Sequence, residues 1–315
     1  MPAIITITPN PAIDKSSSVS SITPEKKMKC SRPVFEPGGG GVNVARAIKK
    51  LKGNATAIYF AGGYAGKFYE ELLTKEGIES DVVEIRDHTR ENLIIADDST
   101  NLQYRFGMPG PVITEFEWKK LLQKIEKIQN IEFIVGSGSL SPGIPTDFYA
   151  RIAFIAKKKN AKFIVDTSGE ALQLAIDEGV FLIKPSLTEL NALFGKSDYD
   201  NETVSDLANR VISSSHCEAI LVSLGAAGAV LVNKSGMEKI IPPTVNVKST
   251  VGAGDSLVAG VVLSLSRGKT LYEAAQYGVA CGTAATLNVG TSLCKLEDVE
   301  RIYYIISEKT LKVNL

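Results

Sequence analysis

The stretch STVGAGDS, residues 249–256, stands directly before an apolar helical pattern. Its glycines let the backbone turn tightly with N–H groups facing inward, and the helix start adds the positive end of its dipole, so the turn attracts an anion such as phosphate. Asp255 falls in the first turn of that helix. A capping role would account for Asp255 alone, but it does not account for the glycines at 252 and 254. We therefore interpret the stretch as a phosphate-binding turn with a carboxylate beside it.

Two common nucleotide motifs do not fit this sequence. The dinucleotide fingerprint G-x-G-x-x-G needs a third glycine where Leu257 stands. A Walker A loop ending in Gly268-Lys269-Thr270 would need a leading glycine where Leu263 stands. The sequence therefore disfavours both a Rossmann dinucleotide site and a P-loop.

A second glycine run, GGGG at 38–41, precedes helical spacing over 42–51. Four glycines exceed what a turn needs, because each glycine costs conformational entropy. Close approach of a ligand to the backbone is the more economical explanation, and a flexible hinge loop is the alternative. Asn43, inside the helical pattern, can donate and accept hydrogen bonds towards a sugar hydroxyl.

Short apolar runs with β character alternate with helical patterns over most of the chain. Runs buried on both faces and separated by helices are typical of a parallel sheet, so we predict an α/β layered fold. The predicted strands are 4–8, 56–61, 133–136, 163–166, 181–184, 220–223 and 229–232. The predicted helices are 42–51, 67–76, 115–128, 146–159, 170–178, 204–213, 251–267, 271–287 and 296–308.

Two segments, about 16–35 and 81–106, break this alternation with polar and apolar runs that no helix separates. We predict that they form a small sheet of antiparallel strands, which projects from the main layer as a lid or a dimer contact. No stretch has the composition of a flexible linker. Residues 1–315 are therefore predicted to form one domain into which these segments are inserted.

Candidate binding groups are expected at one edge of the predicted sheet. In an open parallel sheet, ligands bind at the carboxyl ends of the strands, which places Asp14, Ser139 and Asp166 along one rim with the glycine run. The two inserted segments also carry a group of cations, namely Lys26, Lys27, Lys29, Arg32, Arg90 and Arg105. A phosphorylated substrate would need such groups, because arginine can bind a phosphate through two parallel hydrogen bonds. The alternative interpretation is that these charges form an ordinary solvated face.

The composition excludes several classes of partner. The 35 Lys+Arg balance 35 Asp+Glu, and this zero net charge disfavours a sequence-independent nucleic-acid binder. No apolar stretch approaches the roughly 20 residues of a bilayer span, and the first residues do not resemble a signal peptide. The 4 cysteines lack metal or disulfide spacing and are expected to be buried in a cytoplasmic protein. With only 2 histidines, a carboxylate is the expected general base.

Taken together, the two glycine motifs make the sequence resemble the ribokinase/PfkB family of carbohydrate kinases over nearly its whole length. The family signatures read GGGGVNVA at 38–45 and STVGAGDS at 249–256. NPAID at 10–14 and TREN at 89–92 resemble the sugar-phosphate branch of the family. PVFEP at 33–37, Gly40 and YRFGMPG at 104–110 are most similar to its minor bacterial 6-phosphofructokinases of the PfkB type. The resemblance implies a ribokinase-like three-layer α/β/α fold whose small β lid forms a homodimer.

The resemblance also implies a reaction, namely transfer of the ATP γ-phosphate to the 1-hydroxyl of fructose 6-phosphate. Asp255 would accept the hydroxyl proton, while backbone N–H groups at 252–254 would stabilise the transferring phosphoryl. Those N–H groups belong to Gly252, Ala253 and Gly254. The sugar phosphate would be bound by Asp14, Gly38, Gly39, Asn43, Ser139 and Arg90, with Arg105 as a second candidate for the 6-phosphate.

The nucleotide and cation sites are implied in the same way. ATP would be lined by Lys184, Ser186, Ser223, Gly225, Gly228, Val279 and Thr283, and Lys27 would reach the ATP of the partner subunit. Glu189 would act on Mg²⁺ through water, because hard cations prefer oxygen ligands. A candidate K⁺ loop, rich in backbone carbonyls, comprises Ser249, Val251, Ala285, Asn288 and Gly290.

Two departures from the family pattern and two alternatives stay open. The family motif N-x-x-E begins here with Ser186, whose shorter hydroxyl predicts a weaker affinity for nucleotide or Mg²⁺. Lys29 replaces an arginine of the close relatives and removes a bidentate grip in the lid. The substrate could instead be tagatose 6-phosphate or fructose 1-phosphate. A non-catalytic sugar-phosphate or nucleotide sensor is the other alternative, against which the retained Asp255 argues.

Overall fold

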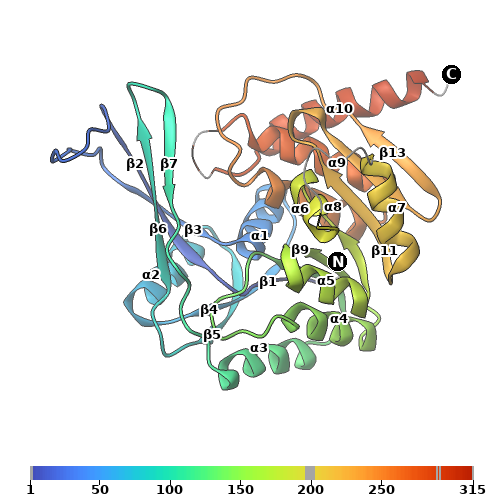
Figure 1. Ribbon diagram of the computed structural model, residues 1–315, viewed down its shortest axis with the longest axis horizontal. Helices are drawn as coiled ribbons and strands as arrows, with labels where there is room; N and C mark the ends of the chain where they lie inside the picture. Colours follow the sequence, from blue (N-terminus) through green and yellow to red (C-terminus); the bar gives the residue numbers. More distant parts are fainter. Residues whose placement is uncertain (1–2, 196–202, 289, 291, 314–315) are drawn as a thin grey trace.

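A large sheet forms the middle of the molecule, and helices cover both of its faces (Figure 1). The computed structural model describes residues 3–195, 203–288, 290 and 292–313. Within these residues the large sheet has nine strands in the order β13-β12-β11-β10-β9-β8-β1-β4-β5, and only the pairs β11-β12 and β12-β13 are antiparallel. The strands are β1 (Ala3–Thr8), β4 (Thr56–Ala61), β5 (Glu79–Glu84), β8 (Ile131–Ser137), β9 (Lys162–Asp166), β10 (Val180–Ile183), β11 (Cys217–Ser223), β12 (Ala229–Asn233) and β13 (Gly236–Ile240).

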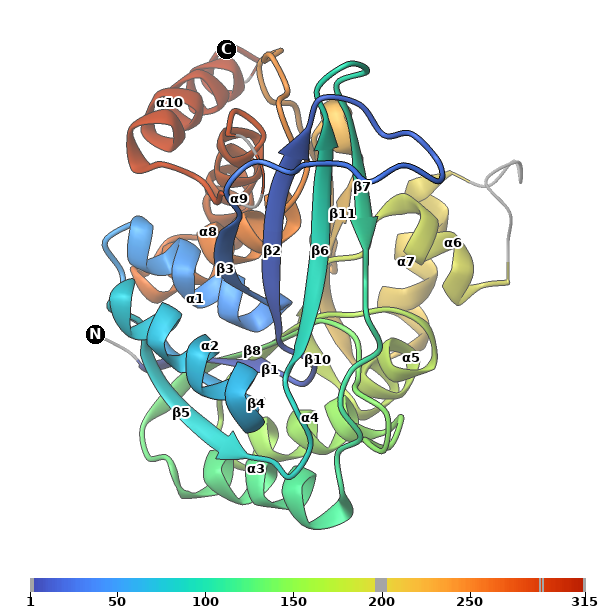
Figure 2. The same cartoon turned by 90° about the vertical axis from the view of Figure 1, so that its left-hand side faces the viewer.

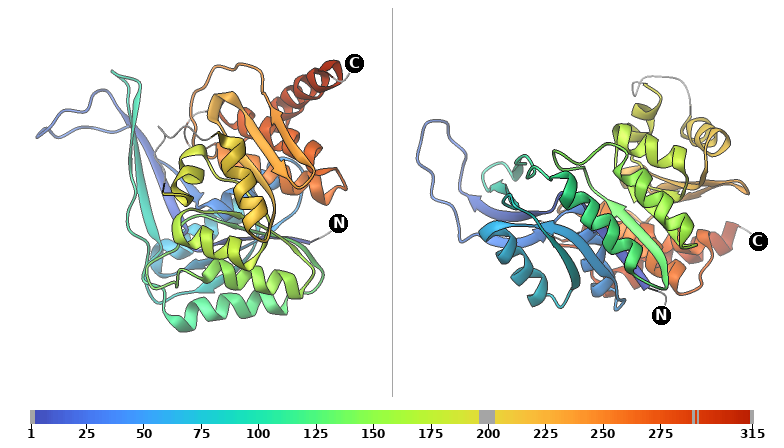
Figure 3. Two further views of the ribbon diagram at one scale, coloured as in Figure 1. Left: turned by 45° about the vertical axis from the view of Figure 1, so that its right-hand side comes forward. Right: turned by 90° about the horizontal axis from the view of Figure 1, so that it is seen from below.

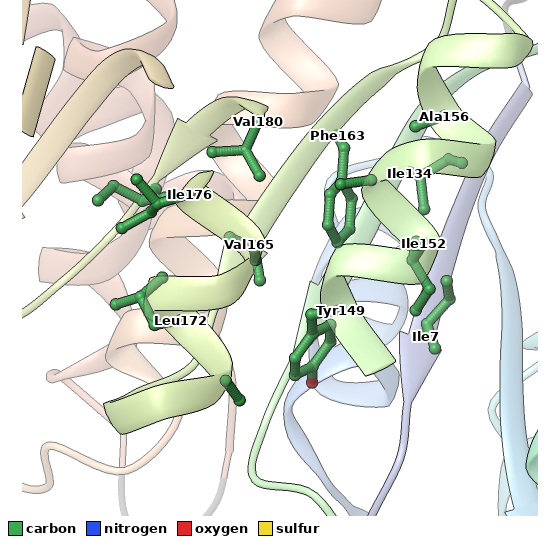
Figure 4. Packing of buried hydrophobic residues seen from close by; sticks show 14 of the residues in the cluster. Ile7, Ile134, Tyr149, Ile152, Ala156, Phe163, Val165, Leu172, Ile176 and Val180 are labelled. Carbon is green, nitrogen blue, oxygen red and sulfur yellow. The ribbon is translucent and has the colours of Figure 1, made fainter. Parts of the chain in front are cut away.

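Successive side chains of a strand point to opposite faces, and this alternation divides the helices into two layers. Ile5 and Ile7 of β1 pack in the same cluster as α3–α7, while Ile4 packs with α1 and α8–α10. Figure 4 shows Ile152 of α4 beside Ile7. The predicted three-layer α/β/α fold is confirmed. The helices are α1 (Gly40–Lys50), α2 (Gly63–Lys75), α3 (Glu115–Lys127), α4 (Phe148–Lys158), α5 (Gly169–Glu178), α6 (Leu187–Leu193), α7 (Val204–Ser214), α8 (Ala253–Ser266), α9 (Leu271–Ala285) and α10 (Leu296–Val313).

A separate small sheet rises from one end of the large sheet (Figures 2 and 3). Its order is β3-β2-β6-β7, with β2 parallel to β6 and the other two pairs antiparallel. The expectation of antiparallel strands alone is therefore wrong for the central pair. The chain passes through β4, α2 and β5 between β2 and β6, and such a crossover returns the chain in the parallel sense. The strands are β2 (Ala12–Val19), β3 (Val34–Gly38), β6 (Arg90–Asp97) and β7 (Leu102–Phe106).

Three further elements and the burial of one cysteine differ from the prediction. The run 81–85, assigned to the inserted segment, belongs mostly to β5 at the edge of the large sheet. Helix α6 was missed, since its seven residues are too few to show a helical period. Strand β13 was also missed, because four of its five residues are exposed and it lacks an apolar run. Cys30 is exposed, whereas the other three cysteines are buried as expected.

The glycine run lets α1 begin in direct contact with the strand ends. A Cβ on Gly41 would overlap the backbone carbonyl of Ile7 and lie 2.7 Å from Thr8 Oγ1. A Cβ on Gly40 would overlap the side chain of Ser137 at the end of β8. The interpretation as close approach of a ligand is therefore incomplete, because at these two positions the close neighbour is the protein itself. None of the described helices has the length and apolar character needed to cross a membrane.

The first prediction concerns this contact. We expect Gly41→Ala to lower the free energy of unfolding by about 3 kcal/mol, because the overlapping atom is a main-chain oxygen that no rotamer change can move. Urea denaturation measures the change. Gly107→Ala, where the added Cβ meets nothing within 4 Å, is the matched control and should be nearly neutral. Equal stability of both variants would contradict the assignment.

Candidate active site

The carboxyl ends of the parallel strands lie at one edge of the large sheet. Asp166 is the last residue of β9, Ser223 is the last residue of β11, and Lys184 directly follows β10. Ser139 follows β8 by two residues. The structure thus collects at one edge four polar side chains that are far apart in the sequence.

The turn before α8 presents Asp255 to this edge. Gly252, whose φ of 72° is in the left-handed region, precedes the helix, and Ala253 is its first residue. The Asp255 carboxylate accepts a hydrogen bond of 2.9 Å from Asn43 Nδ2 on α1. Asp255 therefore binds a side chain of another helix, which a helix-capping role would not explain. The two glycine motifs, 212 residues apart between Asn43 and Asp255, meet at this hydrogen bond.

The environment of Asp255 suits a general base. Burial, together with the charge of Asp166, raises the pKa of the Asp255 carboxyl to about 7. The hydrogen bond from Asn43 and the charges of Lys184 and Arg46 oppose this rise in pKa. A carboxyl with a pKa near 7 can be ionised at neutral pH and still accept a proton readily.

A buried ion pair lies next to Asp255. Lys184 Nζ is 3.2 Å from Asp166 Oδ1, and both side chains are largely buried. The negative charges of Asp166, Glu189 and Asp255 raise the pKa of Lys184 against the effect of burial, so the ammonium stays charged. The three carboxylates leave an excess of negative charge beside the ammonium, but within the described part of the chain no three acidic side chains are grouped closely enough to hold a metal ion, so a cation here would be bound largely through water.

Glu189, whose charge also acts on Lys184, is positioned by the first turn of α6. Its Oε2 accepts hydrogen bonds from the backbone N of Ser186 at 2.7 Å and from Ser186 Oγ at 2.9 Å. Ser186 Oγ in turn accepts from the Glu189 backbone N at 3.2 Å, which completes a capping box. Ser186 therefore caps the helix and orients Glu189. The sequence-based prediction of a weaker affinity for nucleotide or Mg²⁺ did not include this role of Ser186.

A cavity of about 340 Å³ opens beside the N-terminus of α8. Its wall includes Ala253 and Gly254 of the phosphate-binding turn. Five residues predicted for the nucleotide site line it, namely Ser223, Gly225, Gly228, Val279 and Thr283. Lys184 and Ser186 do not line it, although Lys184 Nζ would lie 3.6 Å from a Cβ on Gly254. The segment 242–247 also lines the cavity and was missed, since its run of two prolines carries no nucleotide signature.

Asp14 lies on the small sheet. It is the third residue of β2, and its Oδ1 accepts a hydrogen bond of 2.9 Å from Asn92 Nδ2 on β6. A Cβ on Gly38 would overlap the Asp14 carboxylate, whereas Gly39 has a φ of 114° and turns the chain into α1. Burial raises the pKa of Asp14, and the Asn92 hydrogen bond and the charge of Arg90 oppose this rise.

Arg90 is held by backbone oxygens at the base of the small sheet. Its guanidinium donates to the carbonyls of Asn10 at 3.0 Å and Met108 at 2.9 Å, and more weakly to Pro11 at 3.4 Å. Asn10 Nδ2 donates to Ser139 Oγ at 3.2 Å. Asn10 thus connects the predicted 6-phosphate ligand Arg90 to the predicted sugar ligand Ser139.

The two segments of the candidate K⁺ loop also meet. Ser249 Oγ donates to the Gly290 carbonyl at 2.9 Å and accepts from the Val251 N at 3.2 Å. The Asn288 backbone N donates to the Ala285 carbonyl at 3.1 Å. Carbonyl and hydroxyl oxygens are a donor set that fits a monovalent cation.

Two predicted binding residues are not brought to these groups within the chain. Lys27 lies in the exposed segment 20–33 between β2 and β3. Arg105 is exposed on β7, hydrogen-bonds Gln103, and pairs with Ile94 rather than with Arg90. Ile94 is four residues beyond Arg90 on β6, which corresponds to about 13 Å along the strand.

The comparison with known proteins agrees with this geometry. The model of the pfkB family of carbohydrate kinases matches residues 3–298. The chain belongs to the pfkB family. It is 41% identical over 308 residues to the ATP-dependent 6-phosphofructokinase isozyme 2 of Escherichia coli, covering 98% of this chain and 100% of that protein. It is 33% identical to the 1-phosphofructokinase of Borreliella burgdorferi, covering 95% and 96% of the two chains.

Solved structures of this family have the same fold as this chain. Crystal structures of Escherichia coli phosphofructokinase-2 superpose with TM-scores of 0.94 for a complex with potassium and 0.92 for a complex with fructose-6-phosphate. These chains are 41% and 39% identical to this one, and each match covers 98% of this chain and 100% of that chain. The protein is thus a sugar kinase of the pfkB family, as the resemblance implied.

Three residues of this kinase site were given no role from the sequence. Asp166 was placed at the rim but not paired with Lys184, Asn92 was not paired with Asp14, and Arg46 was overlooked. The first two pairs join residues from different elements, and Arg46 is held in the site by an ion pair with Glu76 beyond α2. No local pattern could have revealed them.

The second prediction uses the raised pKa of Asp255. Between its ordinary value of 3.8 and about 7, the folded kinase holds a proton that the unfolded chain has lost, so the unfolding free energy falls as pH rises through this window. Asparagine removes this dependence. Asp255→Asn should therefore raise the melting temperature more at pH 8 than at pH 5, measured by thermal unfolding. Glu71→Gln, an exposed carboxylate on α2, controls for the loss of one charge, and equal shifts at both pH values would contradict the raised pKa.

Proposed function

We propose that this kinase transfers the γ-phosphate of ATP to the 1-hydroxyl of fructose 6-phosphate and so forms fructose 1,6-bisphosphate. The observation that carries the proposal is the hydrogen bond between Asn43 and Asp255 at the N-terminus of α8, beside the cavity. The activity named for the 41% identical relative and the sugar phosphate in its crystal structure support the choice of substrate.

The reaction follows from the positions of the charged groups. The Asp255 carboxylate takes the proton of the sugar 1-hydroxyl while the hydroxyl oxygen bonds to the γ-phosphorus. The bond between that phosphorus and the β,γ-bridging oxygen breaks, and ADP leaves with that oxygen. The first N–H groups of α8 have no acceptor within the helix, so those of Gly254 and its neighbours can stabilise the transferring phosphoryl. Asp14 and Asn43 orient the sugar, so that positioning supplies much of the rate.

The cation sites are part of the same proposal. Glu189 and Asp166, whose charges surround Lys184, would hold Mg²⁺ largely through water, and the ion would neutralise phosphate charge when bound. The oxygens of the Ser249 and Gly290 segments would hold K⁺ near the phosphate-binding turn. The potassium in the relative's crystal structure supports this assignment.

The small sheet is proposed as the lid and the homodimer contact. Large apolar side chains are exposed on it and just beyond it, including Leu102 at 58%, Val34 at 56% and Phe106 at 48%. Such a group of exposed apolar side chains is typical of an interaction surface. Association through this sheet would bring the exposed Lys27 and Arg105 of one subunit towards the site of the other.

The third prediction concerns the substrate. We expect kcat/KM in a coupled assay with ATP and Mg²⁺ to be highest for fructose 6-phosphate, followed by tagatose 6-phosphate and then fructose 1-phosphate. Arg90 at the base of the small sheet could hold the remote phosphate of each of these sugars, so the expected order rests on the activity named for the 41% identical relative. Asp255→Asn is the inactive control and should still bind ATP. A preference for fructose 1-phosphate would overturn the substrate, and no turnover of any sugar phosphate would favour a sensor.

The fourth prediction concerns Arg90 itself. Arg90→Ala should raise the KM for the sugar phosphate much more than the KM for ATP, because the guanidinium would hold the 6-phosphate. Steady-state kinetics with each substrate varied measure both constants. Arg90→Lys keeps the charge and should recover part of the affinity. Equal increases in both KM values would count against a 6-phosphate contact, and Arg105→Ala tests whether a second guanidinium contributes.

A further inference from the structure

The guanidinium of Arg46 connects Asp255, through Asn43, to β3 and to the end of α2. The side chain of Arg46, on α1, is only 3% exposed. Its Nε and Nη2 bind both oxygens of Glu76 just beyond α2, at 2.8 and 2.6 Å. Its Nη1 donates to the Pro37 carbonyl on β3 at 2.8 Å and to Asn43 Oδ1 at 3.2 Å, and Nη2 also reaches Glu36 at 3.3 Å.

The contact with Asn43 determines which way the amide faces. The oxygen and nitrogen of an asparagine amide have nearly the same shape, so hydrogen bonding decides its orientation. A guanidinium can only donate, and therefore the Asn43 oxygen must face Arg46. The amide nitrogen then faces Asp255 and donates to it at 2.9 Å.

We propose that Arg46 is a positioning residue for catalysis, which fixes the amide of Asn43 so that it donates to the Asp255 carboxylate and keeps the base ionised. The inference rests on the proposed function, in which Asp255 takes the proton of the sugar hydroxyl. Arg46 acts through Asn43 and does not touch the reacting atoms. Without Arg46, the amide could turn its oxygen towards Asp255, and two facing oxygens favour the protonated carboxyl.

The other groups that face Asp255 do not supply this contact. Asp166 on β9 raises the pKa of Asp255, while Lys184 beyond β10 and Arg46 on α1 lower it by charge. The charge of Lys184 is divided among three carboxylates and is closest to Asp166. Among these groups of the described chain, the donor in hydrogen-bond contact with Asp255 is Asn43.

Arg46 also connects the base to the sugar-binding strand. Its donation to the Pro37 carbonyl holds the residue directly before Gly38, where the chain packs against Asp14. The same guanidinium therefore fixes Asn43 relative to the backbone of β3. Glu76, which lies outside the site, neutralises the buried charge of Arg46. The ion pair therefore stabilises the fold, while the Nη1 hydrogen bond orients the amide of Asn43.

The experiment separates orientation from stability. Arg46→Met should lower kcat at pH 7 about fivefold and move the acidic limb of the kcat profile up by about one pH unit, as expected when a carboxylate with a pKa near 7 loses one donor. Activity should recover towards the wild-type value at pH 9, and the KM for ATP should change little. Arg46→Lys, which can supply one donor, should recover part of the shift and serves if the methionine variant does not fold.

Two controls decide the mechanism. Glu76→Gln removes the ion pair but leaves Nη1 on Asn43, so it should lower the melting temperature without moving the pH limb. An equal shift of the limb in Glu76→Gln would overturn the proposal. In the background of Asn43→Ala, Arg46→Met should cause a much smaller shift, because only the direct effect of the Arg46 charge on Asp255 then remains. Additive shifts would also overturn it.

A measurement that needs no turnover separates this inference from the proposed function. Carbon-detected NMR of the Asp255 carboxyl, assigned by its loss in Asp255→Asn, should show its pKa raised in Arg46→Met relative to wild type. An unchanged pKa would refute the role of Arg46. Absence of sugar phosphorylation by wild type would refute the proposed function and leave this titration readable.

Discussion

The contact between the start of α1 and the end of β1 is the constraint on which the site depends. Gly41 allows the helix backbone to lie against the Ile7 carbonyl, and the Val42 N donates to Thr8 Oγ1 at 2.7 Å. This contact fixes both the origin and the direction of α1. The helix then carries Asn43 to Asp255 and Arg46 to β3, so one backbone approach aligns the large sheet, the small sheet and α8.

The site contains more buried negative charge than the fold alone would favour. Burial raises the pKa of Asp255 and of Asp166, and the charges of Asp166 and Glu189 add to these two rises respectively, which means that ionisation of both groups opposes folding. Lys184 offsets part of this repulsion. The remaining excess of negative charge suits the proposed function, in which Asp255 must be ionised near neutral pH to act as a base. A bound cation would neutralise the charge of the other carboxylates. Function and stability therefore make opposite demands on the same carboxylates.

The sequence predicted those parts of the structure whose signal is local. The glycine runs, the alternation of apolar runs with helical periods, and Asp255 in the first turn of a helix are all readable within about fifteen residues. Ser186 was read only as a substitution in a family motif, and its capping box with Glu189 became clear from the coordinates. The strand β5 was misplaced because an edge strand of a parallel sheet alternates like a strand of an antiparallel one.

Pairs that join distant elements could not be predicted in the same way. Arg46 and Glu76 are 30 residues apart, and Asp14 and Asn92 are 78 residues apart. Their meeting depends on the packing of α1 against α2 and on the parallel register of β2 with β6. An arginine in an amphipathic helix ordinarily faces solvent, so sequence alone gives no reason to bury Arg46.

The zero net charge acquires a more exact meaning from these pairs. Two buried cations are neutralised by carboxylates, Lys184 by Asp166 and Arg46 by Glu76. Arg90 differs, because its three acceptors are main-chain carbonyls, which orient a guanidinium without neutralising it. The charge of Asp14 acts on Arg90, but its carboxylate is hydrogen-bonded to Asn92, so a phosphate could supply a closer counter-charge to the guanidinium without displacing a carboxylate. The balance of charges over the whole chain is thus compatible with binding a phosphorylated sugar, because the hydrogen-bond partners of Arg90 are main-chain oxygens and not a carboxylate.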